Sequence, residues 1–280
     1  MFLLGILLLV VLVWVAYFMM PAPAGLPILA YHKLSSSAPG EVVVTASQLN
    51  EQLAAIERLG FTPIWFADLK QILTGYQPLP NKPVVLTFDD ECENVYSLAY
   101  PLLRKYQIKA NLFLPTKLPR SAEAEARVFK EEIIGEMMKG LVRVGVLLNR
   151  LESDEPYSAA QIDEDLRQST GAMKQVQCSF AHVIAYPYGV ARSSRRFRKA
   201  IKPIFEQHGV DFTVDIGSGT NYFPLRDVFQ LRRTTINGTD SLSRFKKKLK
   251  GGRVLGWNGN ARSRSAAKSQ RARRAAELIH

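Results

Sequence analysis

The sequence predicts an α/β fold, a distorted (β/α) barrel, from two observations. Strand-like and helix-like segments alternate from about residue 27 to residue 250. Apolar strand-like runs also end in polar or acidic side chains, and in the clearest of them, PVVLTFDD at 83–90, Asp89 and Asp90 close the run. Because barrel enzymes place their sites where the strands end, we expect a site at these carboxylates.

The first half of the chain predicts three strands and three helices. The strand at about 27–32 brings Tyr31 and His32 to its end. The helix at 47–59 follows a capping Thr45 or Ser47 and ends at Gly60. A short helix at 65–73 precedes the β-branched strand 83–88, and the helix at 94–106 leads into the buried strand 110–115.

The second half continues the alternation after a polar segment, 117–128, that predicts a surface loop. We expect helices at 129–139, 158–176, 194–207 and 240–250, and strands at 142–148, 180–186, 210–215 and 228–232. The helix 158–176 places Ile162, Leu166 and Met173 on one face, which is typical of core packing. Pro187 and Gly189 form a rigid turn after the strand 180–186.

Residues 1–20 predict a membrane anchor. They contain no charged side chain, and twenty helical residues span about 30 Å, the thickness of the bilayer hydrocarbon core. The alternative is a signal peptide, since Ala22 and Ala24 offer a cleavage pattern, but the apolar run exceeds the usual signal length. We expect an uncleaved, single-pass signal anchor.

The positive charge is concentrated at the C-terminus. The chain carries a formal charge of +12, and residues 240–280 hold 12 Lys and Arg against Asp240 and Glu277, a surplus of 10. Residues 251–280 have few bulky apolar side chains and predict a disordered tail. The 240–280 segment is expected to bind an anionic lipid or polymer, or to act only as a solubilising tail. Nucleic acid is not the expected partner, because no recognition motif accompanies the basic residues. The domain itself is expected at 26–250.

Several motifs resemble the polysaccharide deacetylases, the NodB-homology or carbohydrate esterase family 4-like proteins. VVLTFDDE at 84–91, the stretch 99–116 and IAYPYG at 184–189 occur in the expected order after PILAYHKLS at 27–35. The resemblance implies the NodB-type barrel and hydrolysis of an N-acetyl group on a hexosamine. It also implies a divalent, zinc-like metal held by one Asp and two His.

The resemblance assigns roles to individual residues. Asp89 would be the general base and Asp90 the metal ligand. Tyr186, Pro187 and Tyr188 would line the substrate site, although for each tyrosine core packing is an equally good interpretation.

The chain departs from the family where the metal-binding His pair should lie. Leu147 and Leu151 fall at about those positions, and an isobutyl group cannot coordinate a metal. The candidate substitutes are His32, Glu91 and Glu93, although His32 also has a purely structural interpretation. No histidine other than the terminal His280 follows His208, so the usual late general acid is missing as well.

These observations predict a membrane-anchored, polysaccharide-deacetylase-like hydrolase. It would act on the N-acetyl C–N amide bond of an envelope hexosamine glycan, with activity weakened or lost because Leu replaces the His pair. By resemblance, the domain lies outside the cytoplasmic membrane. Two alternatives stay open: a non-catalytic carbohydrate-binding or scaffold relative, and an anchored adaptor acting through its basic tail.

Overall fold

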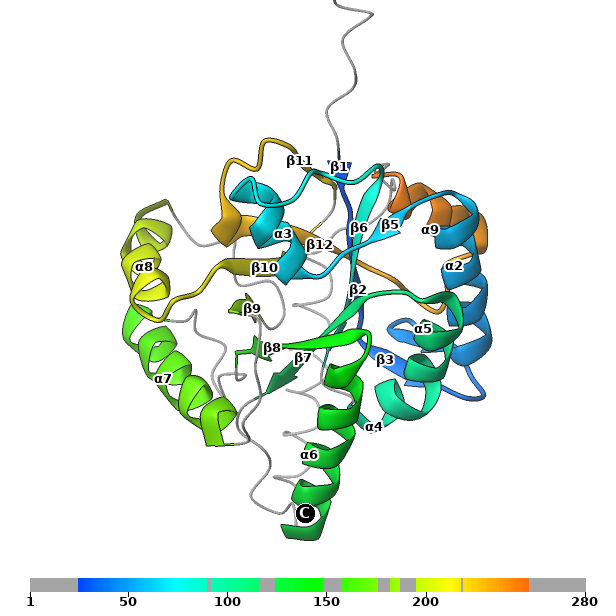
Figure 1. The fold of residues 1–280 in the computed structure, drawn as a ribbon, viewed down its shortest axis with the longest axis horizontal. Coiled ribbons are helices and arrows are strands. Elements are labelled where there is room, and N and C mark those ends of the chain that lie inside the picture. The colour runs from blue at the N-terminus through cyan, green and yellow to red at the C-terminus, as the bar shows by residue number, and fades with distance from the viewer. Residues whose placement is uncertain are drawn as a thin grey trace, which may run out of the picture.

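Eight parallel strands form the main sheet of the computed structural model, which describes residues 25–89, 92–115, 124–148, 158–175, 182–186, 195–217 and 219–251. The order is β2-β12-β10-β9-β8-β7-β6-β5, and β6 also pairs with β2, so all but β5 close into a barrel (Figure 1). The strands are β2 (Ile28–Tyr31), β5 (Thr62–Pro63), β6 (Pro83–Asp89), β7 (Ala110–Pro115), β8 (Val142–Leu147), β9 (Val183–Ala185), β10 (Phe212–Ile216) and β12 (Leu231–Thr235). The predicted barrel is therefore confirmed.

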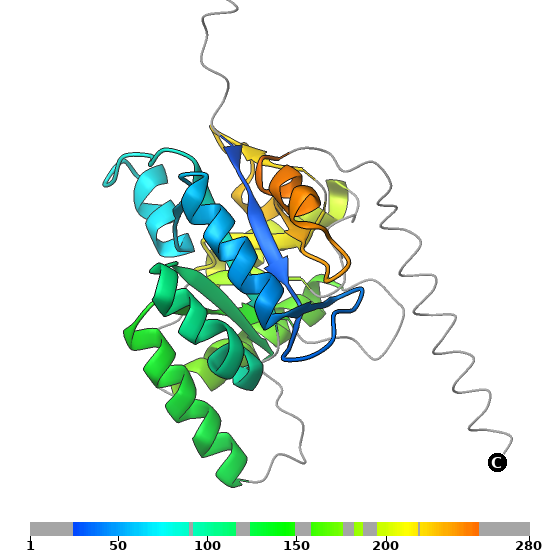
Figure 2. The same cartoon turned by 90° about the vertical axis from the view of Figure 1, so that its right-hand side faces the viewer.

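Helices surround this barrel (Figures 1 and 2). They are α2 (Ala46–Arg58), α3 (Phe66–Leu73), α4 (Cys92–Asn94), the π-helical turn η1 (Val95–Ala99), α5 (Tyr100–Tyr106), α6 (Ala124–Lys139), α7 (Ala159–Gln175), α8 (Arg195–Gln207) and α9 (Leu242–Leu249). In space, α2 lies against α5 and α9, whereas α7 and α8 pack together on the opposite side of the barrel.

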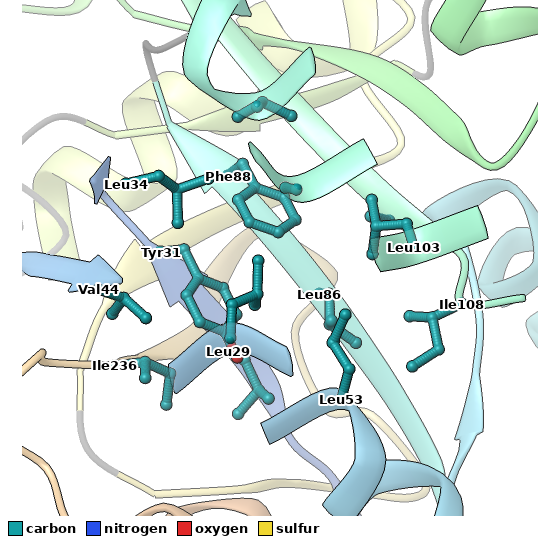
Figure 3. Close-up of a cluster of buried hydrophobic side chains, with 14 of the residues drawn as sticks. Leu29, Tyr31, Leu34, Val44, Leu53, Leu86, Phe88, Leu103, Ile108 and Ile236 are labelled. Carbon is teal, nitrogen blue, oxygen red and sulfur yellow. The ribbon is translucent and has the colours of Figure 1, made fainter. Parts of the chain in front are cut away.

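Alternation along the strands divides the core between the inside of the barrel and its outer layer. Phe113, Phe212 and Val85 belong to one buried cluster, which α3 extends through the ring of Phe66. The next residues along the strands face the helices: Figure 3 shows Leu86 of β6 and other strand residues beside apolar side chains of α2 and α5.

Two predicted boundaries were wrong. The segment 117–128 was predicted as a loop, but α6 already begins at Ala124, because Ala, Glu and Arg at 124–127 favour a helix. The strand predicted at 228–232 lies at 231–235 instead. Residues 228–230 form a 3-10 turn, η3, because the side chain of Asp227 accepts a hydrogen bond from the Phe229 amide.

Four short strands, which were not predicted, form two separate two-stranded sheets. They are β1 (Gly25–Leu26) with β11 (Asn221–Tyr222), and β3 (Lys33–Ser35) with β4 (Val43–Thr45). The predicted anchor at 1–20 and nearly all of the predicted tail at 251–280 lie outside the described residues. Within the described part of the chain, no helix has the length and apolar character needed to cross a bilayer. The domain boundaries stay predictions.

Candidate functional site

Asp89, the last residue of β6, has both carboxylate oxygens engaged by nitrogen atoms. Nη1 of Arg233 donates to Oδ1 at 2.6 Å, and Nδ1 of His32 lies 3.2 Å from Oδ2. The Asp89 side chain is 9% exposed and the Arg233 side chain 0%. The predicted acid therefore lies at the end of a barrel strand inside a nearly dry ion pair, where electrostatic interactions are stronger than in water.

Arg233 reaches this carboxylate from β12 across the neighbouring strand β2. The register pairs Ala30 of β2 with Thr87 of β6 and with Thr235 of β12. At this level, the strand between β6 and β12 therefore carries only a methyl side chain. Nη1 of Arg233 also donates to Oγ1 of Thr87 at 3.2 Å. The guanidinium carbon lies 5.2 Å from the ring centre of Phe113 on β7, a cation–π distance.

The Arg233 guanidinium is only partly hydrogen-bonded. Its Nε and Nη2 atoms are buried and have no hydrogen-bond partner among the described residues. A guanidinium carries five N–H donors, and buried donors in folded proteins are nearly always paired. The unpaired edge of Arg233 is therefore the most unusual polar feature of this site.

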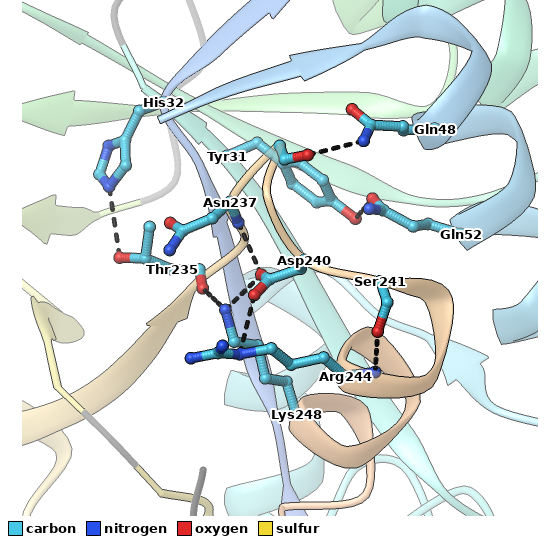
Figure 4. A network of polar contacts seen from close by, with 11 residues as sticks. Tyr31, His32, Gln48, Gln52, Thr235, Asn237, Asp240, Ser241, Arg244 and Lys248 are labelled. Carbon is cyan, nitrogen blue, oxygen red and sulfur yellow. Dashed lines mark hydrogen bonds and ion pairs between the residues drawn. The ribbon is translucent and has the colours of Figure 1, made fainter. Parts of the chain in front are cut away.

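His32 connects Asp89 to a second polar network, seen in Figure 4. Its Nε2 lies 3.4 Å from Oγ1 of Thr235, and the backbone oxygen of Thr235 accepts a hydrogen bond of 2.8 Å from Nζ of Lys248 on α9. Lys248 also pairs with the buried Asp240. The imidazole, 28% exposed, is therefore held at the strand ends by groups of β6 and β12.

The charges around Asp89 set its protonation. Burial raises the pKa of the Asp89 carboxyl, but the Arg233 guanidinium and the His32 imidazole outweigh burial and hold that pKa below its usual value. Asp89 is thus ionised at neutral pH, and it is a weaker base than a free aspartate.

Tyr186 lies away from this carboxylate. It is 3% exposed and its ring meets Phe205 of α8 edge-on, at 6.3 Å between ring centres, within the cluster shared by β8, α7 and α8. Burial raises the pKa of its hydroxyl. These contacts match the core-packing interpretation; the expected substrate contact stays a prediction. Pro187 and Tyr188 lie outside the described residues.

The described residues do not fit a metal centre with three protein ligands. No group of three or more His, Cys, Asp or Glu side chains is gathered anywhere in the described ranges. Leu147, at one expected His position, packs against the apolar interior of the barrel, and His32 is engaged by Asp89. Glu93, in α4, is exposed, while Asp90, Glu91 and Leu151 lie outside the described residues.

Sequence reasoning found Asp89 and His32 but missed Arg233, Thr87 and Thr235. The available signal was the alternation of Leu231, Arg233 and Thr235 in LRRTT, which places all three on one face of a strand. The predicted strand ended at residue 232, so this face was not recognised.

Comparisons with known proteins agree with the barrel and with the motifs. Residues 76–214 match the family model described as polysaccharide deacetylase. The poly-beta-1,6-N-acetyl-D-glucosamine N-deacetylase of Escherichia coli (strain K12) is 33% identical over 85 residues, which are 30% of this chain and 13% of that protein. This chain therefore matches only a small part of that relative.

Two solved structures share the fold over most of the chain. The Streptococcus pyogenes deacetylase PplD in complex with acetate has a TM-score of 0.67 and 22% identity, with 81% of this chain and 99% of that chain covered. IcaB from Ammonifex degensii has a TM-score of 0.65 and 23% identity, with 81% and 97% covered.

Proposed function

Since the chain belongs to the polysaccharide deacetylase family, we propose that it hydrolyses the N-acetyl C–N amide bond of a hexosamine glycan of the cell envelope, more slowly than an enzyme with the full metal site. The observation that carries the proposal is the cluster of the buried Asp89 and Arg233 with the half-buried His32 at the strand ends of the barrel. The similarity to the Escherichia coli poly-beta-1,6-N-acetyl-D-glucosamine N-deacetylase supports the substrate class.

Each residue of the cluster has a defined part in this reaction. Asp89 accepts a proton from the attacking water through the lone pairs that Arg233 and His32 leave free. Because its pKa is depressed, Asp89 removes that proton less readily, which supports a reduced rate. His32 is the more exposed member of the cluster, so it faces the approaching glycan and keeps Asp89 oriented.

A second candidate function is carbohydrate binding without catalysis. Two observations favour it: both oxygens of Asp89 are already engaged, and Leu147 replaces a ligand of the divalent ion that the family resemblance implies. Such a relative would hold an N-acetylated glycan without releasing acetate, and chelators would leave its binding unchanged.

Acetate release distinguishes the two functions. The full chain, purified in detergent, is incubated with N-acetylglucosamine oligomers, and free acetate is measured with and without a chelator. We expect slow release by the wild type and none by Asp89→Asn. Asp211→Asn is the matched control, because Asp211 is a surface acid paired with Lys70. Glycan binding with no acetate from the wild type would favour the binding protein.

We further propose that residues 1–20 anchor the protein in the membrane, with the domain outside the cytoplasmic membrane. The uncharged run and its length support this. After alkaline extraction of membranes, the full chain should stay in the pellet and a variant lacking 1–20 should be released. Equal release of both would contradict the anchor.

The 240–280 segment is proposed to bind anionic lipid or polymer, as its surplus of basic residues suggests. In the adaptor alternative, this segment carries the function by itself. Removing 251–280 should then abolish partner binding while acetate release and folding of the barrel persist. Binding of vesicles rich in phosphatidylserine, compared with neutral vesicles, measures the effect; equal binding by both forms of the protein would contradict it.

A further inference from the structure

Large apolar side chains are exposed at one end of the barrel. Among the described residues, those that are exposed are Leu73, Tyr76, Leu79 and Tyr222, here called the basal patch. Leu73 ends α3, and Tyr76 and Leu79 follow in the loop that leads into β6. Tyr222 lies in β11, which pairs with β1 just before β2 begins (Figure 1). All four therefore lie where the barrel strands begin, opposite Asp89. Single exposed apolar residues are ordinary, but their gathering at one end indicates a contact surface.

The loop that carries Tyr76 is held by hydrogen bonds, although the Tyr76 side chain is the most exposed of the four, at 84%. The amide of Tyr76 donates to the backbone oxygen of Gln71 at 2.9 Å, and Nζ of Lys82 donates to the backbone oxygen of Leu59 at 3.0 Å. The adjacent α3 buries the ring of Phe66 in the apolar cluster inside the barrel. The core is therefore closed at this end without the basal patch, whose side chains stay on the outside.

Both ends of the described domain meet at this end of the barrel. A Cβ at Gly25 would lie 2.7 Å from Cγ2 of Thr220, and a Cβ at Gly251 would overlap Oγ1 of the same side chain. Thr220 directly precedes β11, so the proposed anchor and the basic tail both join the domain beside the basal patch. Even fully extended, the chain from residue 20 to Gly25 spans at most about 18 Å. The proposed anchor therefore ends close to the basal patch, whatever path the linking residues take.

The chemistry of this end fits an anionic lipid surface. Tyrosine has an apolar ring and a polar tip, so it is enriched at the boundary between lipid headgroups and acyl chains. Lys82, directly before β6, and Arg226, after β11, are exposed at the same end, and the basic tail continues from Gly251. A second copy of the chain docked on the basal patch would bring these positive charges against one another, which disfavours a dimer through this face.

We propose that the basal patch lies in the headgroup region of the membrane that holds residues 1–20, with the rings of Tyr76 and Tyr222 at the boundary of the acyl chains. The inference rests on the proposed anchor and gives the domain an orientation. Asp89 is at the far end of the seven-residue β6, so the tilted strand places it about 15 Å farther from the membrane than the basal patch. The candidate site then opens away from the lipid, towards a glycan outside the membrane.

Quenching of a fluorescent label by lipid tests this orientation on the full chain. Cys92→Ser and Cys178→Ser remove the native thiols, so that a single added cysteine takes an environment-sensitive label. Tyr76→Cys places the label in the basal patch, and Ser37→Cys is the matched control, an exposed position in the loop after β3 at the opposite end of the barrel. Both proteins are reconstituted into vesicles of phosphatidylcholine and phosphatidylglycerol that carry a nitroxide quencher near the headgroups of both leaflets.

We expect the label introduced by Tyr76→Cys to lose fluorescence and the label introduced by Ser37→Cys to keep it. Alkaline extraction of the same vesicles measures the anchor separately. If the chain is retained and the two labels are quenched equally, the docking is overturned and the anchor stands. If the chain is released and only the label of Tyr76→Cys is quenched, the docking stands without the anchor. Release with equal quenching overturns both. Disulfide cross-linking between two copies of unlabelled Tyr76→Cys, in place of quenching, would assign the basal patch to a dimer and overturn the inference.

Discussion

Replacing Arg233 by methionine should destabilise the fold strongly, because it leaves the Asp89 carboxylate buried without its cation. The Arg233 side chain is fully buried and Asp89 nearly so, with 2.6 Å between Nη1 and Oδ1. Breaking a buried pair by removing one partner typically costs about 3–5 kcal/mol. We expect the free energy of unfolding of Arg233→Met to fall by that amount, with the lower end favoured because His32 still contacts Oδ2.

The double variant Asp89→Asn, Arg233→Met separates the charge effect from lost packing. Asparagine is nearly isosteric and uncharged, so the double variant should recover most of the stability lost in Arg233→Met. Equilibrium urea unfolding at pH 7, followed by circular dichroism on the full chain in detergent, measures each form of the cycle. Arg232→Met, at an exposed position, should stay within about 0.5 kcal/mol of the wild type. Strictly additive losses, or a loss under about 1 kcal/mol in Arg233→Met, would refute the ion pair.

Three further predictions concern packing and pH. Gly145→Ala should cost about 1–3 kcal/mol, because its Cβ would lie 2.6 Å from an inward aromatic ring, whereas Gly135→Ala, with nothing near its Cβ, should be neutral or stabilising in the same unfolding assay. Lys248→Met removes a buried cation and should cost about 3–5 kcal/mol, while the exposed Lys247→Met should have little effect. The hydrogen bond from His208 holds the pKa of Asp163 below its usual value. The stability advantage of the wild type over Asp163→Asn should therefore be full at pH 7 and shrink below about pH 4. An advantage that grows in acid would contradict this prediction.

The barrel could be predicted because its strands carry local signals. β6 is a run of β-branched and apolar residues that is buried along its whole length, and the predicted strand 83–88 nearly coincides with it. The helix α2 was placed within a residue of its observed bounds, since Thr45 forms a capping box with Gln48 and Gly60 follows the helix. Strong local preferences and the final fold agree at these positions, so the sequence alone was enough.

Strands of two or three residues carry too little pattern to be recognised. β5 and β3 are examples, because their pairing depends on neighbours that are distant in the chain. The start of α6 was missed for a different reason: a polar segment is compatible with both a loop and an exposed helix, and only the intrinsic helix preference of its residues distinguishes the two.

The site was predicted in part because only one half of it has a local signature. The acidic end of β6 can be read from adjacent residues, and so can the Tyr-His pair that ends the first barrel strand. Arg233, in contrast, lies 144 residues from Asp89 in sequence. It becomes a partner of Asp89 only when β12 pairs with β2 and closes the barrel. Because the predicted strand ended at residue 232, Arg233 was not recognised as a strand residue. Contacts made by closing a barrel cannot be read from spacing.

The buried arginine matters for any reaction at the acidic end of β6. A carboxylate alone at the strand ends would repel the negative charge that forms on an attacked acyl oxygen, so it would oppose the reaction that it initiates. Arg233 lies against Asp89, so the same strand end carries a negative group and the positive group that balances its charge. Leu147, which packs against the apolar cluster inside the barrel, is not part of this pair of opposite charges. The proposed hydrolysis therefore requires that the Asp89 carboxylate accept a proton while it stays paired with Arg233.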